Sequence, residues 1–389
     1  MTMKNGPLAG IKVVEIAGIG PAPCCGMLLA DMGAEIILID RKQPNTNAAK
    51  GFADNDDSEK KIFNRGKRSI AVDLKSEQGV ELVLTLIADA DVLIEGFRPG
   101  VMERLGLGPY ICLDRNPKLV YGRMTGWGQT GPLAHAAGHD PNYIGISGAL
   151  AYAAREGKTP SVPLTLIGDI GGGTMVLACG ILCGVIHAQR TGQGQVIDAA
   201  ITDGSAYLTS LLWFMHNTDQ IDDQPGSGWA DGAAPWNDSY ACADGSYITI
   251  CALEPLFYKE LIQRLELEEN PIFAQQWDRD FWPQGKKILE QLFLEKRRDH
   301  WCELLEGTDA CFAPVLRFSE AVKHPHNVAR ETFLDIRGVV QPAPAPKFSR
   351  SEPRAGIPPK TGEHSDDILL NVGLGQVEIA RLKAEGVVG

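Results

Sequence analysis

Strand-like and helix-like patterns alternate along the first third of the chain. The β-branched run Ile11–Ile16 leads into a glycine turn, and the apolar-periodic segment Cys24–Met32 then predicts a helix. Gly33 ends that helix and Glu35–Asp40 supplies a second strand, which together predict a βαβ unit. This rhythm is typical of a doubly wound parallel sheet. It continues with helices expected at Ser76–Ala88 and Val101–Leu105 and strands expected at Ala71–Leu74, Asp91–Ile94 and Leu119–Met124.

The pattern changes after Asp169. The glycine run Gly171–Gly173 leads into a long helix of small residues expected to end near Gln189, and a second apolar helix is expected at Ala206–Met215. Residues 240–316 then have the pattern of a smaller mixed α/β lobe. The Pro-rich tract 341–346 predicts an extended connection, followed by a C-terminal helical cap over 366–385.

A chain of 389 residues exceeds the size at which a single core usually keeps growing, so we expect two lobes. The predicted class is α/β, with a large Rossmann-like parallel-sheet lobe and a smaller α/β lobe. The large lobe is expected over 1–190 with 330–389 returning to it, linker helices over 191–235, and the small lobe over 236–329.

The composition narrows the class of ligand. Hydrophobic residues make up 44% and charged residues 22% of the chain, which favours a packed core over disorder. The formal net charge of −12 disfavours a nucleic-acid partner, because phosphate backbones need a clustered basic surface. The longest apolar stretch, Met175–Ile186, contains two glycines and is shorter than the ~20 residues of a bilayer span, so no membrane segment is expected.

The termini and the cysteines bear on the compartment. Residues Met1–Lys12 lack a basic region followed by an apolar block, and Val387–Gly389 is not a peroxisomal tripeptide, so we expect a cytoplasmic location. Nine cysteines, an odd number without CxxC pairs, lie in apolar segments and include Cys24, Cys25, Cys179, Cys183 and Cys251. This predicts reduced, buried thiols and no metal site.

The turn after the first strand resembles a dinucleotide-binding fingerprint. Gly18 and Gly20 follow the strand, and Asp40 occupies the place of the ribose-binding acid. However, Pro21 and Pro23 stand where that fingerprint needs an open backbone and a close helix contact. The sequence therefore disfavours a nicotinamide cofactor.

Basic residues recur near the ends of the expected strands in the first hundred positions. Ligands of open α/β sheets bind outside the carboxyl ends of the strands, so these side chains are expected to converge on one crevice. Guanidinium groups bind phosphates bidentately, which suits a ligand with several phosphate groups. Each residue taken singly also fits a solvated surface charge. The set consists of Arg41, Arg65, Lys67, Arg68, Lys75, Arg98 and Arg104.

Three segments place titratable side chains next to backbone that can approach a ligand. His139 follows a glycine, and Asp169 lies between Gly168 and the glycine run. Asp140 is expected to cap a helix whose free amides could bind an oxyanion, and Glu254 follows an expected strand, where a carboxylate can orient an imidazole. Singly, these residues also fit a structural histidine, a helix cap and a surface turn.

Several longer motifs accompany these residues. They are Val92–Val101, Thr125–Pro132, Ala137–Asp140, Gly168–Asp169, Gly192–Ala199, Glu254–Pro255 and Thr308–Cys311. Together they resemble the family III CoA-transferase (CaiB/BaiF-type) group, and within it the racemases that act on 2-methylacyl-CoA thioesters. The resemblance runs from Ile11 to about Arg350.

The resemblance implies a reaction and a set of roles. His139 and Asp169 would be acid/base groups on opposite faces of the substrate's α-carbon, one removing the proton and the other returning it. Glu254 from the small lobe of a partner subunit would hydrogen-bond His139, and the amide of Asp140 would stabilise the enolate oxygen. Coenzyme A is part of the substrate, so no further cofactor is expected, and two chains would form an interlocked homodimer. The residues implied in coenzyme A docking are Arg41, Val72, Leu74, Lys75, Gly96, Arg98 and Arg104.

Three positions depart from the pattern of these racemases. Ala233 stands where glycine is usual, Asn237 where a tyrosine commonly lines the active site, and Thr165 where asparagine is usual. These departures bear on acyl preference and turnover more than on the type of reaction.

Two other functions fit parts of the pattern. In a family III CoA-transferase, an aspartate at the place of Asp169 attacks the thioester and forms a mixed anhydride. His139 favours the racemase, because nucleophilic transfer does not require a second proton-transfer group. A non-catalytic acyl-CoA carrier would need only the basic residues and an apolar groove, leaving His139 and Asp169 without a task.

Overall fold

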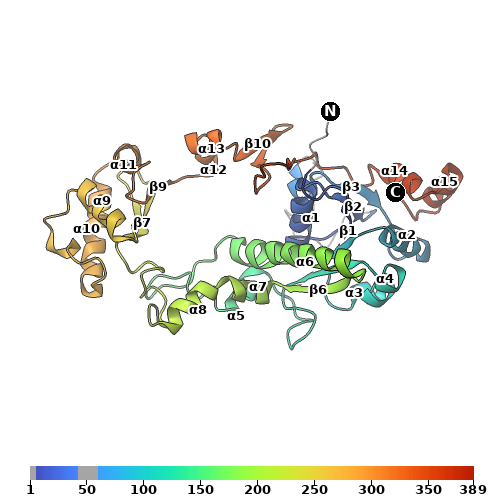
Figure 1. The fold of residues 1–389 in the computed structure, drawn as a ribbon, viewed down its shortest axis with the longest axis horizontal. Helices are drawn as coiled ribbons and strands as arrows, with labels where there is room; N and C mark the ends of the chain where they lie inside the picture. The colour runs from blue at the N-terminus through green and yellow to red at the C-terminus, as the bar shows by residue number, and fades with distance from the viewer. Residues whose placement is uncertain (1–5, 43–59) are drawn as a thin grey trace. The chain divides into compact units, whose positions relative to one another are not determined.

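The computed structural model describes residues 6–42 and 60–389 (Figure 1). They form two compact units. The first unit takes in the described residues up to Ser147 together with Leu164–Leu208 and Glu331–Gly389, and the second consists of Gly148–Pro163 and Thr209–Arg330. The stretch 148–163, expected in the large lobe, belongs to the second unit, where Arg155 forms an ion pair with the buried carboxylate of Asp238.

A six-stranded parallel sheet forms the centre of the first unit, as the alternating pattern predicted. The strand order β3-β2-β1-β4-β5-β6 reverses direction between β1 and β4, the switch point beside which ligands of such sheets bind. β6 was not expected as a strand, and β3 begins three residues before the expected run Ala71–Leu74 and shares only Ala71 with it. The strands are β1 Lys12–Ile16, β2 Glu35–Asp40, β3 Arg68–Ala71, β4 Val92–Glu95, β5 Val120–Thr125 and β6 Gln195–Ala200.

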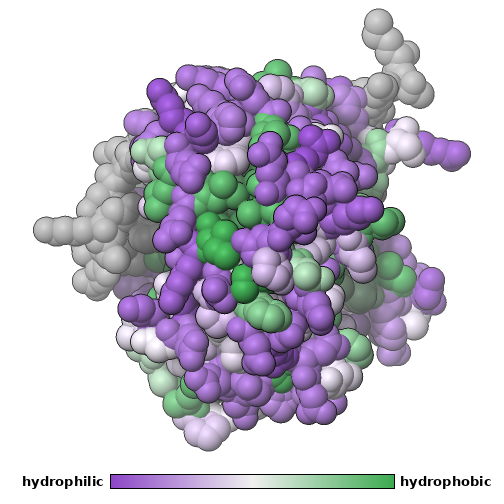
Figure 2. All heavy atoms as spheres, turned by 90° about the vertical axis from the view of Figure 1, so that its left-hand side faces the viewer, coloured by the Kyte–Doolittle hydropathy of each residue, from purple (hydrophilic) through white to green (hydrophobic). Residues whose placement is uncertain are grey.

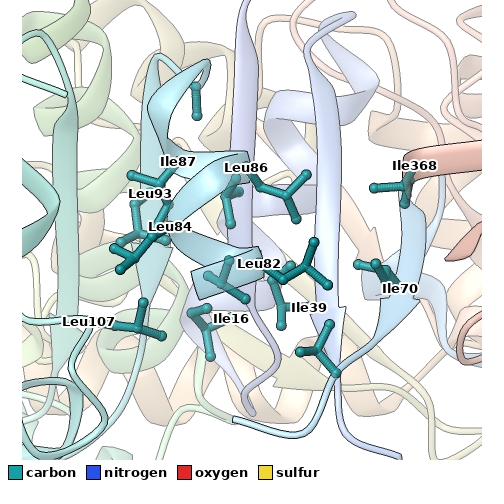
Figure 3. Packing of buried hydrophobic residues seen from close by; sticks show 14 of the residues in the cluster. Ile16, Ile39, Ile70, Leu82, Leu84, Leu86, Ile87, Leu93, Leu107 and Ile368 are labelled. Atoms are coloured by element: carbon teal, nitrogen blue, oxygen red, sulfur yellow. The ribbon is translucent and has the colours of Figure 1, made fainter. Parts of the chain in front are cut away.

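One face of the sheet is covered by α2 (Glu77–Ala88) and the C-terminal helices α14 (Ser365–Asn371) and α15 (Gln376–Ala384). Leu82 and Leu86 of α2 belong to the same buried cluster as Ile16 and Ile39 of the strands, and Figure 3 shows these side chains packed together. Ile368 of α14 adds to this core from more than 270 positions further along the chain. The C-terminal stretch Glu331–Gly389 therefore completes the first unit.

The opposite face is covered by α1 (Pro21–Asp31) and by one long helical run, seen along the sheet in Figure 1. This run starts as a π-helix, η3 (Leu166–Met175), and continues as α6 (Val176–Thr191). A Cβ on Gly184 would lie 2.7 Å from the Val120 side chain, so the glycine lets α6 approach β5 closely. Among the described residues, this is the one helix long and apolar enough to cross a membrane by length and composition, and 44% of its most apolar window is buried.

The second unit has its own core. A three-stranded antiparallel sheet, β7 (Asn237–Ala241), β8 (Tyr247–Cys251) and β9 (Phe312–Val315), packs with α9 (Pro255–Arg264), α10 (Trp282–Leu294) and α11 (Arg298–Leu305). Large aromatic side chains such as Trp236 and Phe293 are buried there. Leu256, Trp277 and Phe318 remain exposed, and Figure 2, which faces this unit, shows hydrophobic side chains gathered among hydrophilic ones.

The expected burial of the cysteines holds only in part. All nine are unpaired, and Cys24, Cys25 and Cys112 are buried, but Cys179, Cys183 and Cys251 are exposed in this chain. In α6 the exposed pair lies on the side opposite the buried residues, which include Leu177, Ile181 and Gly184. The smaller elements are η2 Ile62–Asn64, α3 Val101–Arg104, α4 Pro109–Arg115, α5 Asp140–Ile146, α7 Ile201–Leu208, α8 Ser210–Asn217, η4 Pro271–Phe273, η5 Arg279–Phe281, α12 Phe318–Ala321, α13 Pro325–Ala329, β10 Phe333–Ile336 and β11 Val339–Pro342.

Candidate active site

His139 is the N-cap residue of α5, whereas the sequence predicted that Asp140 would cap this helix. The backbone N–H of His139 donates a hydrogen bond to Oδ1 of Asn142 (3.0 Å), which fixes the backbone at the start of the helix. Pro141 occupies the second helical position, where a missing N–H costs little. The imidazole is exposed, while Asp140 at the first helical position is buried.

The buried carboxylate of Asp140 joins this helix to the segment that carries Asp169. Its Oδ2 accepts a hydrogen bond from the backbone N–H of Asp169 at 2.7 Å. A Cβ on Gly168 would lie 2.2 Å from the same oxygen, so only glycine permits this approach. The two segments that the sequence singled out separately therefore meet, and His139 and Asp169 both lie beside Asp140.

Asp169 has an environment suited to proton transfer. Burial and the neighbouring negative charge of Asp140 raise its pKa to about 6, and attraction to His139 opposes this rise. A carboxyl group that titrates near neutral pH can both accept and donate a proton under the same conditions. The geometry and the charges together make Asp169 a candidate acid/base group.

Asp169 stands in the first turn of the π-helix η3, a form of helix that is frequent at functional sites. The N–H of Ile170 donates to the carbonyl of Thr165 (3.2 Å), five residues earlier. Thr165 has φ +60°, a left-handed conformation that β-branched residues rarely adopt and asparagine tolerates well. The departure noted at this position therefore places strain directly before the helix of Asp169.

Two aromatic residues to which the sequence analysis gave no role pack against Gly138 beside this site. Trp127 and Tyr143 are packed edge to face with ring centroids 4.7 Å apart. The Tyr143 hydroxyl donates to the carbonyl of Gly138, the residue before His139. Burial and the charge of Asp169 raise the pKa of Tyr143, while the charge of Arg98 lowers it. Arg98 from the basic set thus lies near enough to act electrostatically on the same site.

The glycine turn after β1 also belongs here. A Cβ on Gly20, which has φ +75°, would lie 3.8 Å from Oδ2 of Asp169. The Thr174 hydroxyl of η3 donates to the carbonyl of Pro21 (3.0 Å) and so ties α1 to the helix of Asp169. The turn that resembled a dinucleotide fingerprint instead faces a candidate acid/base residue.

Most of the basic set lies at the carboxyl edge of the sheet, as expected. Arg41 follows β2 directly, Lys75 comes four residues after β3, and Arg98 follows β4 by three residues. The side chains of Arg41, Lys75, Arg98 and Arg104 are exposed, and the Arg41 guanidinium lies 5.9 Å from the centre of the Phe97 ring. Val72 is buried and forms a bridge with Val388, Leu74 is half-buried and Gly96 is exposed.

The other three basic residues of that set serve the interior or a surface pair. Arg65 is buried and donates to Asp31, and Lys67 is fully buried and donates to Oε1 of Glu15 at 2.7 Å. Arg68 pairs with Glu35 at 2.8 Å across neighbouring strands. The expected placement of Arg65 and Lys67 at a phosphate-binding crevice is therefore wrong, because the buried carboxylates of Asp31 and Glu15 already neutralise them.

Glu254 lies in the second unit, as the exposed N-cap residue of α9 and three residues after the end of β8. Asn237, one of the departures, donates from its side-chain amide to the carbonyl of Trp229 at 2.8 Å. This hydrogen bond ties the Asn237 side chain to the backbone of Trp229 within the second unit. No group of three or more His, Cys, Asp or Glu side chains in residues 6–42 and 60–389 is arranged to hold a metal ion.

Comparison with known proteins gives a consistent result. A model of CoA-transferase family III matches residues 8–365. The chain is 41% identical over 384 residues to the alpha-methylacyl-CoA racemase of Mus musculus and 39% identical to that of Homo sapiens, covering 98% of this chain and 97% of each relative. A crystal structure of a CAIB/BAIF family protein from Brucella suis superposes with a TM-score of 0.80 at 27% identity, covering 95% of this chain and 100% of that one.

Proposed function

The chain belongs to CoA-transferase family III, and we propose that it interconverts (2R)- and (2S)-2-methylacyl-CoA thioesters by removing and returning the proton at C2. Its identity of 39–41% to two mammalian racemases over nearly their whole length supports this reaction. The observation that carries the proposal is the bond between Asp140 and Asp169, because it brings the histidine and aspartate segments together. An isomerase with these two groups needs no cofactor, since coenzyme A is part of the substrate.

His139 and Asp169 act as the two acid/base groups of this reaction. A hydrogen next to a thioester carbonyl is a very weak acid, so a positioned base must act while charge on the oxygen is stabilised. One group removes the proton from one face of C2, and the other returns a proton to the opposite face of the planar enolate. Two groups of different type let the enzyme accept either configuration.

In this proposal the backbone N–H of Asp140 stabilises the enolate oxygen. Amides at the start of a helix have no intrahelical acceptor and carry partial positive charge, which suits a developing oxyanion. Removing one such donor costs about 3 kcal/mol of transition-state stabilisation in other enzymes. Burial, together with the charge of Asp140, raises the pKa of Asp169 to about 6, which accords with a site that keeps one carboxyl group near its protonation midpoint.

Coenzyme A docks along the carboxyl edge of the sheet in this proposal. The exposed guanidiniums of Arg41, Arg98 and Arg104 and the ammonium of Lys75 are suited to its phosphate groups. Gly96 offers open backbone at the end of β4, the strand beside the switch point. Val72 and Leu74 would line the same region through backbone and apolar contacts.

We further propose that the enzyme is an interlocked homodimer in which Glu254 of one chain hydrogen-bonds His139 of the other. The support is the exposed position of Glu254 at the start of α9 and the exposed imidazole of His139. Such a carboxylate would fix the tautomer of the histidine. A cytoplasmic location stays a prediction.

A CoA-transferase reaction is the second candidate, because the family includes it and Asp169 is a half-buried carboxyl group. In that reaction Asp169 would attack the thioester and release coenzyme A. His139 argues for the racemase, since it supplies the second proton-transfer group that epimerisation needs.

The test is to incubate a single 2-methylacyl-CoA epimer with the protein in heavy water. We expect deuterium at C2 together with appearance of the other epimer. Movement of coenzyme A to an added carboxylic acid, without deuterium at C2, would establish the transferase instead.

A further inference from the structure

A buried ion network lies directly beneath the proposed coenzyme A edge. Glu95, the last residue of β4, is fully buried, and its Cα partner in the sheet register is Arg123 of β5. The Arg123 Nε donates to Oε1 of Glu95 at 2.9 Å. Its two terminal nitrogens donate to both oxygens of Glu103 at 2.8 and 3.3 Å. Arg123, a residue that is only 6% exposed, thus joins β4, β5 and α3 through its guanidinium.

Stability alone does not account for this network. Taking charged groups out of water is costly, and a buried ion pair is often no more stable than apolar side chains of similar volume. What the planar guanidinium does provide is fixed geometry, because it donates in a rigid fork to both carboxylates.

Each carboxylate holds one part of the loop that carries the exposed arginines. Oε2 of Glu95 accepts the backbone N–H of Phe97 at 2.7 Å, which anchors the residue immediately before Arg98. Glu103 immediately precedes Arg104 in α3. A Cβ on Gly100 would lie 3.3 Å from Nη1 of Arg104, so that guanidinium folds back over the same loop.

Phe97 connects the network to a third exposed arginine, Arg41. The ring of this residue lies 5.9 Å from the guanidinium carbon of Arg41, close enough for a cation–π contact. The anchored backbone of Phe97 therefore sets the place of that ring as well. Contacts thus run from the buried Arg123 to the exposed guanidiniums that follow β2 and β4, the two strands on either side of β1.

We propose that Arg123, with Glu95 and Glu103, is a positioning residue that holds Arg41, Arg98 and Arg104 at the spacing required by the nucleotide end of coenzyme A. This inference rests on the proposed docking of coenzyme A. Arg123 does not touch the substrate; it acts through the loop 96–104. Its loss is therefore felt in binding of the phosphate-bearing part of the substrate and not in proton transfer at C2.

The experiment compares 2-methylacyl-CoA with the same acyl group on pantetheine, which lacks the nucleotide. Glu103→Ala breaks half of the network and is expected to fold, because the Glu103 side chain is 44% exposed. We expect KM for the CoA thioester to rise about 10- to 100-fold, the range found when outer partners of metal-binding side chains are removed. The turnover number and both constants for the pantetheine thioester stay unchanged, as for a loss of uniform binding.

Companion variants separate positioning from general destabilisation. Glu103→Gln keeps an oxygen that accepts one bond and is expected to restore part of the affinity, while Arg123→Met gives the larger loss. Glu81→Ala removes an exposed pair with Arg115 in the same unit and serves as the matched control. An equal fall in turnover with both thioesters, or no change in KM in Glu103→Ala and Arg123→Met, would overturn the proposal.

Calorimetric titration with free coenzyme A and with pantetheine distinguishes this inference from the proposed reaction. If Glu103→Ala weakens binding of coenzyme A but not of pantetheine, the network has its assigned role even in a protein that does not racemise. If the wild-type protein binds coenzyme A no better than pantetheine, the docking edge and the network proposal both fall.

Discussion

The carboxylate of Asp140 accepts a hydrogen bond from the backbone N–H of Asp169 across 2.7 Å. This contact fixes the position of Asp169, and it does so through Asp140, the residue directly after His139. It also places a second negative charge near Asp169, which adds to burial in raising the pKa of that carboxyl group to about 6. The same two residues therefore determine both the geometry and the pH range of the proposed reaction.

The pH profile of hydrogen exchange should show this coupling. In the direction in which Asp169 is the base, the rate should fall as the pH drops through about 6, because the protonated carboxyl group cannot accept a proton. Asp140→Asn retains an oxygen that can accept the Asp169 N–H but removes the charge. The acidic limb of kcat/KM in heavy-water exchange should then move to lower pH, and an unmoved limb would separate Asp140 from the titration of Asp169.

Gly168 should tolerate no side chain. A Cβ there would lie 2.2 Å from Oδ2 of Asp140, so Gly168→Ala must displace either the helix of Asp169 or that carboxylate. Displacements of about 1 Å can cost ~10²-fold in rate, and we expect a loss of this size in the exchange assay. Gly145→Ala in α5 is the control, since nothing lies within 4 Å of its added Cβ. Equal activity of the two variants would contradict the arrangement.

Removing the imidazole should strongly slow exchange while leaving binding intact. His139→Ala is expected to lower the rate of deuterium entry by ~10²–10⁴-fold, the usual contribution of a positioned acid or base. His135→Ala removes an exposed histidine from the same loop and should retain activity. The affinity for free coenzyme A, measured by titration calorimetry, should be the same in both. Full exchange activity in His139→Ala would remove the histidine from the mechanism.

The fully buried pair of Lys67 and Glu15 allows a stability test with a defined sign. Burial raises the pKa of Glu15 to about 7, against the effect of Lys67. Lys67→Met leaves the carboxylate without its cation, which should cost about 3–5 kcal/mol of unfolding free energy at pH 8. Without Lys67 the pKa of Glu15 rises further, so the variant differs most from the wild type where the wild-type carboxylate is ionised. The loss should shrink as the pH falls through about 7, because the wild-type Glu15 then becomes protonated and its ion pair with Lys67 is lost.

Denaturant unfolding at pH 8 and at pH 6 measures this difference. The double variant with Glu15→Gln carries no buried charge and should recover much of the stability at pH 8. A deficit in Lys67→Met that is the same at both pH values would mean that Glu15 is not its source.

The parallel sheet could be predicted because its first strands are short apolar runs bounded by glycines, and such runs carry a strong local signal. β6 lacked that signal, since Gln195–Ala200 contains two polar residues and becomes a strand through pairing with β5. The π-helix was also missed. Its glycine run has no periodicity, and its winding accompanies contacts with α1, such as the bond from Thr174 to Pro21.

The candidate site was predicted in its residues but not in its connections. Glycine next to a titratable residue marked both His139 and Asp169, yet only the fold shows that the Asp140 side chain links them. For Lys67 the sequence prediction failed. A basic residue before a strand has the same local pattern whether its side chain faces a ligand or, as here, the buried carboxylate of Glu15. The role of Glu254 depends on a partner chain and stays a prediction.

The first unit is assembled from three separate stretches of the chain, and this affects the route by which it forms. Contacts such as those of Ile368 with the core around Ile70 join residues almost 300 positions apart, so loop-closure entropy must be overcome before they contribute. Until residues 365–388 dock, the part of this face around Ile70 that α14 covers stays open to solvent. Slow folding and a need for chaperone protection of that face are the expected result.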